Sequence, residues 1–132
     1  MKSDFTGIWR ANLLKSKLLG PIPRSITITI AHSDPDLHQG IVVVKEDGSE
    51  ERLLFNCSTN GKPGSASLNG NPVNGAASWQ GKELAIKLRM QLGTREITLN
   101  DYWSLSPDGN TLTMEHRNDA LSGQITILEK SK

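Results

Sequence analysis

Asp101 and His116 are the residues whose types and predicted positions make them the strongest candidates for a polar site. Asp101 interrupts a stretch, residues 96–106, in which the other side chains of its parity are apolar. Because burying an unpaired charge is costly, a carboxylate on such a face is paired, hydrogen-bonded or close to an opening. His116 shares the parity of Leu112 and Met114 in a later stretch. The pair predicts a polar anchor for a ligand. Two alternatives stay open: an arginine partner or solvent contact for Asp101, and a place on the rim for His116.

Apolar residues that could surround such a ligand are also present. Ligand sites are mostly apolar, with a few polar groups that fix the orientation of the ligand. We therefore predict a ligand-binding set in which Asp101 and His116 make polar contacts and four residues make apolar ones, namely Trp79, Met90, Trp103 and Met114. In the alternative, these apolar side chains simply fill the interior.

A second group of titratable residues surrounds a short polar segment. His32 and His38 flank Asp34 and Asp36, and the histidines could approach each other across a hairpin to hold a metal ion. The Ser-Asp-Pro-Asp sequence at 33–36 is typical of a simple turn, because Asp and Pro both favour turns. We predict the turn, with neither a metal nor another cofactor.

The sequence contains none of the common catalytic motifs. Gly-x-Ser-x-Gly, a Walker-type glycine loop, Gly-x-Gly-x-x-Gly and His-Glu-x-x-His are all missing. Cys57 has the parity of Leu53 and Phe55, which predicts a small buried apolar side chain rather than a nucleophile. These observations favour a protein that is not an enzyme.

The elements that must position these residues are predicted to be short strands. Alternation is clearest at 83–92, where apolar residues occupy every second position, and 25–31 repeats it with isoleucines and threonines. Further strands are predicted at 7–12, 37–45, 50–58, 65–68, 76–80, 96–106, 111–117 and 122–129. Asn-Gly and Asp-Gly pairs, which suit two-residue hairpin turns, occur at 47–48, 60–61, 69–70, 74–75 and 108–109.

This succession of strands predicts an all-β fold. Residues 12–19 allow at most one short helical turn, because Gly20, Pro21 and Pro23 stop anything longer. Strands joined by short turns give antiparallel up-and-down topology, and about eight to ten of them in one small domain must close or split into two sheets. We predict a single antiparallel β-barrel domain spanning residues 1–132.

Composition and charge argue against several partner classes. The chain has 15 basic and 14 acidic residues, so it has no bulk field that would attract nucleic acid, and basic and aromatic residues do not interleave on any strand. No run of about 18 apolar residues predicts a membrane span. Residues 1–5 lack a hydrophobic leader. We expect a soluble protein, cytoplasmic as the sequence stands or periplasmic or secreted if a leader was removed.

The N-terminal residues Gly7-Ile8-Trp9 resemble the Gly-x-Trp motif of lipocalins and related calycin proteins. In that superfamily the tryptophan of the first strand closes one end of an up-and-down barrel, which implies barrel closure by Gly7 and Trp9. Asn100-Asp101-Tyr102 is similar to a second motif, Thr-Asp-Tyr, except at its first residue. A further similarity, to small bacterial lipocalin-like proteins of uncharacterised function, covers Lys15-Ser16, 23–29 and 106–113. The chain departs from vertebrate lipocalins in having one cysteine and no long C-terminal helix.

The resemblance and the candidate residues together give three functional hypotheses. The first is a binding or carrier protein, monomeric or homodimeric, for a small apolar or amphipathic molecule held inside the barrel. The second is a structural or protein-interaction module whose barrel is filled, since a barrel of this size can be packed solid or hold one small ligand. The third is an isomerase or cyclase, chemistry that barrels of this superfamily sometimes host, with Asp101 and His116 as the titratable pair.

Overall fold

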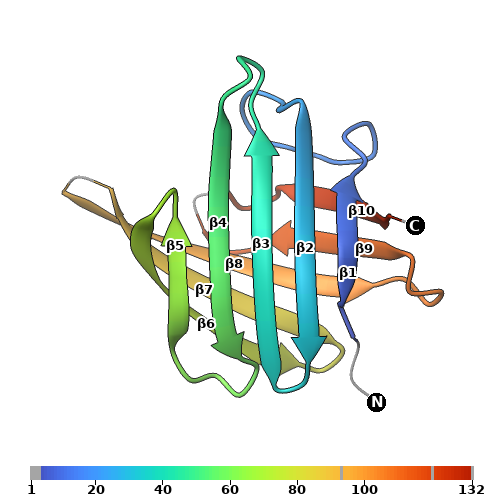
Figure 1. Cartoon of the computed structure of the whole chain (residues 1–132), viewed down its shortest axis with the longest axis vertical. Coiled ribbons are helices and arrows are strands. Elements are labelled where there is room, and N and C mark those ends of the chain that lie inside the picture. The colour runs from blue at the N-terminus through green and yellow to red at the C-terminus, as the bar shows by residue number, and fades with distance from the viewer. Residues whose placement is uncertain (1–3, 93, 120, 132) are drawn as a thin grey trace.

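The computed structural model describes residues 4–92, 94–119 and 121–131, and within these ranges the chain forms ten β-strands. They are β1 (Gly7–Ala11), β2 (Ser25–Ser33), β3 (Asp36–Val44), β4 (Glu50–Ser58), β5 (Gly64–Leu68), β6 (Asn71–Gln80), β7 (Glu83–Leu92), β8 (Arg95–Leu105), β9 (Thr111–His116) and β10 (Ile125–Lys130). Each strand pairs antiparallel with its neighbours in sequence, and β1 also pairs with β10, so the sheet closes into a barrel (Figure 1). The predicted all-β antiparallel barrel is confirmed.

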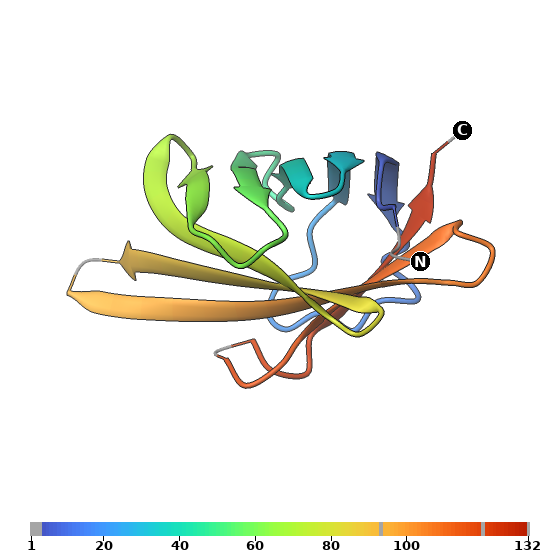
Figure 2. The same cartoon turned by 90° about the horizontal axis from the view of Figure 1, so that it is seen from below.

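The barrel is flattened into two layers whose strands cross steeply (Figures 1 and 2). β1–β5 form one layer and β7–β10 form the other, while β6 passes between them. β6 does so because its first residues pair with β5 and its later residues pair with β7. The β2–β3, β4–β5, β6–β7 and β8–β9 connections define one end of the barrel, which we call the base. The remaining connections define the opposite end, which we call the rim end.

Residues 12–19 contain a turn where the sequence allowed at most one helical turn. The Lys15 amide donates to the Asn12 carbonyl at 3.2 Å, and the Ser16 hydroxyl donates to the same carbonyl at 2.8 Å. Lys17 then forms a bridge with Ile125 at the start of β10, which holds the backbone extended. The described residues include no helix, and therefore none that could cross a membrane.

The Asn74-Gly75 pair does not form the turn that its sequence predicts, because it lies inside β6. A Cβ placed on Gly75 would collide with the Phe55 ring and would lie 3.1 Å from Leu88 Cδ2. The glycine is therefore needed for close approach across the barrel rather than for a turn. At the other end of the chain, β10 begins at Ile125 instead of at 122, because residues 121–124 belong to the turn that follows β9.

Aromatic side chains fill the base of the barrel. The Phe5 ring stacks on His32 and Trp79, with ring centroids 5.7 and 6.0 Å apart, and meets Trp103 edge-on at 5.4 Å. Trp9 lies on β1 and donates its indole Nε1–H to the Phe5 carbonyl at 2.9 Å. Phe5, Trp9 and Trp103 have no solvent-exposed area, so no water-sized space touches them. The base is packed solid around these rings.

Candidate functional site

Several inward-facing apolar side chains at the rim end stay partly accessible, whereas Phe5, Trp9 and Trp103 are fully buried; Cys57, Trp79 and Leu105 at the base ends of their strands are also only partly buried. The rim-end residues have the inward parity of their strands and lie near the rim-end connections. We call them the apolar rim: Ile26, Ile41, Leu53, Leu68, Met90 and Leu99. They come from β2, β3, β4, β5, β7 and β8 and pack against the core. Accessible apolar surface inside a closed barrel is what a small apolar ligand would need.

A surface groove of about 410 Å³ lies beside the apolar rim. Its walls come from the β1–β2 connection, the end of β3 and the β3–β4 turn, and they consist of Pro21, Ile22, Pro23, Val43, Lys45, Glu46 and Asp47. Ile22 in this lining is 57% exposed. Val43 has the inward parity of Ile41 and is the register partner of Ile26, so the groove adjoins the apolar rim.

Asp101 lies on β8 between this accessible half and the solid base. It occupies the inward parity, with the half-buried Leu99 on its rim side and the fully buried Trp103 on its base side. Its Oδ2 accepts a hydrogen bond from the Trp103 indole Nε1–H at 3.0 Å. Its Oδ1 is buried and has no hydrogen-bond partner. Burial raises the pKa of this carboxyl above its ordinary value, and nearby His116 and the Trp103 hydrogen bond only partly oppose the shift.

His116 lies directly opposite Asp101 on the neighbouring strand β9, so the two predicted polar residues are brought together. Its Nδ1 lies 3.0 Å from Asp119 Oδ2. When the Asp119 carboxylate is ionised it can only accept hydrogen bonds, and the proton of this pair lies on Nδ1. The Nε2 atom of the same ring is then the nitrogen left for a ligand or a second proton.

Asp119 is a site residue that the sequence analysis missed. Its side chain has no exposed area, and its carboxylate also accepts the backbone amides of Asn100 at 2.7 Å and Leu121 at 2.8 Å. It lies in the β9–β10 connection, where no strand periodicity marks which side chains point inward. The only available signal was its position shortly after a strand that carries a histidine.

The other predicted site residues lie next to this cluster or apart from it. Met114 is buried and is the register partner of Trp103, so Asp101, Trp103, Met114 and His116 form one contiguous group on β8 and β9. Met90 belongs to the apolar rim. Trp79 shares a cross-strand row with Leu84 and Trp103, but it faces the base and donates its indole Nε1–H to Asp34 Oδ1 at 3.1 Å.

Asp34 organises the polar contacts at the base. Its Oδ1 also accepts the Thr59 hydroxyl at 2.7 Å and lies 3.1 Å from His32 Nε2. The Phe5 amide donates to Nδ1 of the same imidazole at 3.2 Å. His38, by contrast, is exposed and contacts Asn56 at 2.7 Å. The two histidines of the hypothetical metal site thus face opposite sides of the sheet. Within the described ranges no group of three or more His, Cys, Asp or Glu side chains is arranged to hold a metal ion.

Cys57 packs partly buried against the core, on the inward parity that its sequence position predicts. Burial raises the pKa of its thiol to about 12. The thiol is therefore protonated at neutral pH, which makes it a poor nucleophile.

Fold and site together define a closed antiparallel barrel, packed at its base and partly accessible at its rim, an architecture compatible with the calycin and lipocalin-like class. Neither the comparison with protein-family models nor the comparison with curated proteins gives a match for this sequence. A fold alone does not define a function, so the function must be inferred from the residues of the site.

Proposed function

We propose that this protein is a lipocalin-like barrel that binds and carries a small apolar or amphipathic molecule at its rim end. The observation that carries the proposal is the apolar rim: six inward-facing apolar side chains that remain partly accessible although the sheet around them is closed. In this proposal Met90 contacts the apolar part of the ligand, and Asp101 and His116 contact its polar part. Trp103 and Met114 support these two residues from below, and Trp79 does so through the aromatic base.

The N-terminal Gly-x-Trp residues are proposed to close the base. Trp9 is fully buried there. Gly7 has a backbone φ of +148°, an angle that residues with a side chain rarely adopt. A Cβ on Gly7 would approach Lys130 Cε at 2.9 Å. The positions of both residues fit the role that the lipocalin resemblance implies for them.

A filled barrel acting as a structural or interaction module is the second candidate function. The observation in its favour is the complete burial of large side chains such as Trp9, Phe55 and Trp103. If the side chains of the rim end pack as tightly as these residues do, only the outer surface of the barrel is left for function. The binding experiment below separates the two candidates, because a filled barrel offers no interior site for an apolar probe.

Leu53 and Leu54 provide a matched pair for that experiment. They are neighbours on β4, but Leu53 belongs to the apolar rim while Leu54 points outward and is 55% exposed. Nile red, an uncharged apolar dye that brightens in apolar surroundings, is titrated into the wild type, Leu53→Gln and Leu54→Gln. We expect Leu53→Gln to weaken binding about tenfold, because it places a polar amide against the ligand. Leu54→Gln should bind like the wild type. Equal effects of the two substitutions, or no dye binding to the wild type, would contradict the proposal.

A further inference from the structure

We infer that the ligand carries a positively charged nitrogen, such as an amine, that docks on Asp101 beneath the apolar rim. This inference rests on the proposed function, since it specifies the chemistry of the ligand bound at that same site. The inference narrows the proposed class of ligand from apolar or amphipathic molecules in general to amines with an apolar part.

The first support is the unused hydrogen-bonding capacity of Asp101. Oδ2 is occupied by the Trp103 indole, while Oδ1 is buried without a partner. Leaving a buried polar atom unsatisfied costs free energy, so such atoms in folded proteins call for an explanation. An N–H donor from a ligand would satisfy Oδ1. Asp101 is the next inward-facing residue after the partly accessible Leu99, and because Oδ1 is buried, an amine that enters past Leu99 must displace neighbouring side chains to reach it.

The second support is the sign of the local charge. The ionisable side chains that act on Asp101 are His116 and Asp119. A single imidazole can supply at most one positive charge, and the cluster contains two carboxyl groups. Even with His116 protonated and Asp101 neutral, the negative charge of Asp119 cancels the imidazolium. The cluster therefore never becomes net positive while Asp119 is ionised, which disfavours an anionic ligand and favours a cation.

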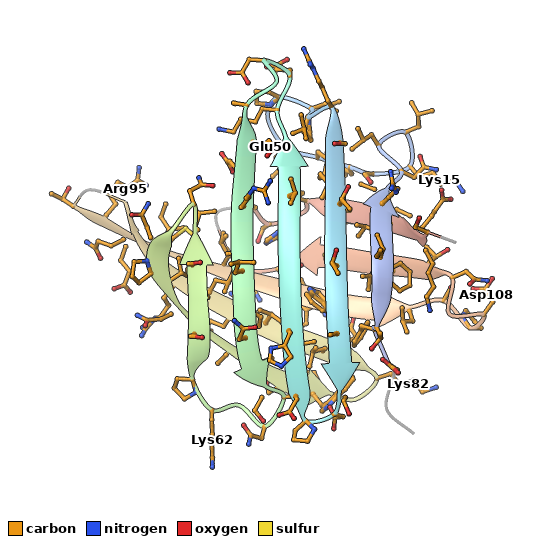
Figure 3. All side chains as sticks on the ribbon, in the orientation of Figure 1. Lys15, Glu50, Lys62, Lys82, Arg95 and Asp108 are labelled. Carbon is orange, nitrogen blue, oxygen red and sulfur yellow. The ribbon has the colours of Figure 1, made fainter. Side chains whose placement is uncertain are left out.

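The third support is the separation of this cluster from the other charges of the chain. Lys15, Lys62, Lys82, Arg95 and Asp108 lie at the periphery of the barrel (Figure 3), and Glu50 is exposed at the start of β4. Arg117, the arginine closest in sequence to His116, is held by Glu83 at 2.7 Å and lies over the Tyr102 ring. A cationic ligand would thus meet an acidic group with little competition from these basic side chains, and the charge-assisted hydrogen bond would form in partly apolar surroundings.

The experiment compares octylamine, octanol and octanoate, which share one apolar chain and differ in the charge of the head group. Each compound displaces Nile red from the wild type. We expect octylamine to act at concentrations about tenfold lower than octanol, the effect of one charge-assisted hydrogen bond, and octanoate to be the weakest. In Asp101→Asn, the ratio of octylamine to octanol affinities should fall from about ten to about one. Asp36→Asn removes the same charge from an exposed site at the base and should keep the wild-type ratio.

The possible outcomes separate the inference from the proposed function. Equal displacement by octylamine and octanol in the wild type, or an unchanged ratio in Asp101→Asn, would overturn the amine assignment while the binding function stands. Failure of the wild type to bind Nile red would overturn the binding function and the inference with it. The comparison within the wild type needs no variant, so it decides the question even if Asp101→Asn does not fold.

Discussion

Asp101 combines three properties that a purely structural carboxylate would not need. It faces the interior, it has one oxygen without a partner, and it lies opposite a histidine that a second aspartate orients. Asp119 contacts the imidazole of His116 at 3.0 Å and so holds the ring of the residue that lies opposite Asp101. A residue of this kind costs stability in the free protein and is consistent with a binding role.

That cost predicts a pH dependence of stability. Burial raises the pKa of Asp101 in the folded state above the ordinary value of 3.8. At pH values between the pKa of Asp101 in the unfolded state and its raised pKa in the folded state, the folded state binds more protons than the unfolded state. Asp101 therefore lowers the stability of the protein as the pH rises through this window. Asp101→Asn removes the effect. We expect the free energy of unfolding of the variant, relative to the wild type, to increase from about pH 4 upward. Urea unfolding at several pH values measures this difference. A constant difference across the range would show that Asp101 ionises as easily in the folded state as in the unfolded state.

At the scale of the element, β6 carries the bend that joins the two layers, and Gly75 lies where β5 pairing gives way to β7 pairing. Gly75→Ala is expected to destabilise the protein by about 1–3 kcal/mol, because the added methyl group collides with Phe55 in a packed interior. Gly40→Ala on β3 is the matched control. Its Cβ would meet Leu54 Cδ2 at 3.6 Å, an ordinary contact, so little change in the midpoint of thermal unfolding is expected. Equal stability of both variants would mean that β6 can move away from Phe55 at no cost.

The same element shows how far the sequence can predict the structure. Alternation in 83–92 and 25–31 was strong enough to identify β7 and β2, because one face of each strand is buried and the other meets water. Asn74-Gly75 misled the prediction because Asn-Gly is a local turn signal, whereas the requirement for glycine comes from Phe55, on another strand. A contact between residues that are far apart in the sequence cannot be predicted from the residue types around either of them. Asp119 was missed for a related reason, since its contact with His116 depends on how a connection folds back.

Asp101, His116, Trp103 and Met114 were predicted from parity alone, and the closed register of β8 and β9 brings them together. Parity could not show which half of the barrel is packed, because that depends on how the two layers meet. The predicted apolar set therefore included Trp79, which contacts Asp34 at the base, and it did not include Leu53 or Leu68 of the apolar rim.

The whole molecule has a base packed by aromatic rings and a rim end where several inward-facing apolar side chains are partly accessible. Closure of the sheet makes this division possible. Each strand is hydrogen-bonded to a neighbour on both sides, so the barrel has no edge strand with unpaired backbone groups. A carrier needs both parts: a solid base that holds the barrel together and an opening through which a ligand can enter and leave.

The most direct test of this central claim is an NMR titration of the methyl-labelled protein with octanol, an uncharged probe that does not depend on the amine assignment. The account predicts shift changes at methyl groups of the apolar rim, such as those of Ile41, Leu53 and Leu99. The methyl groups of Leu84 and Leu112, which have no exposed area, and of the outward-facing Leu54 should stay in place. Shift changes centred on Leu54 and the outer face, or none at the rim at saturating octanol, would contradict the claim and favour a filled barrel that acts through its surface.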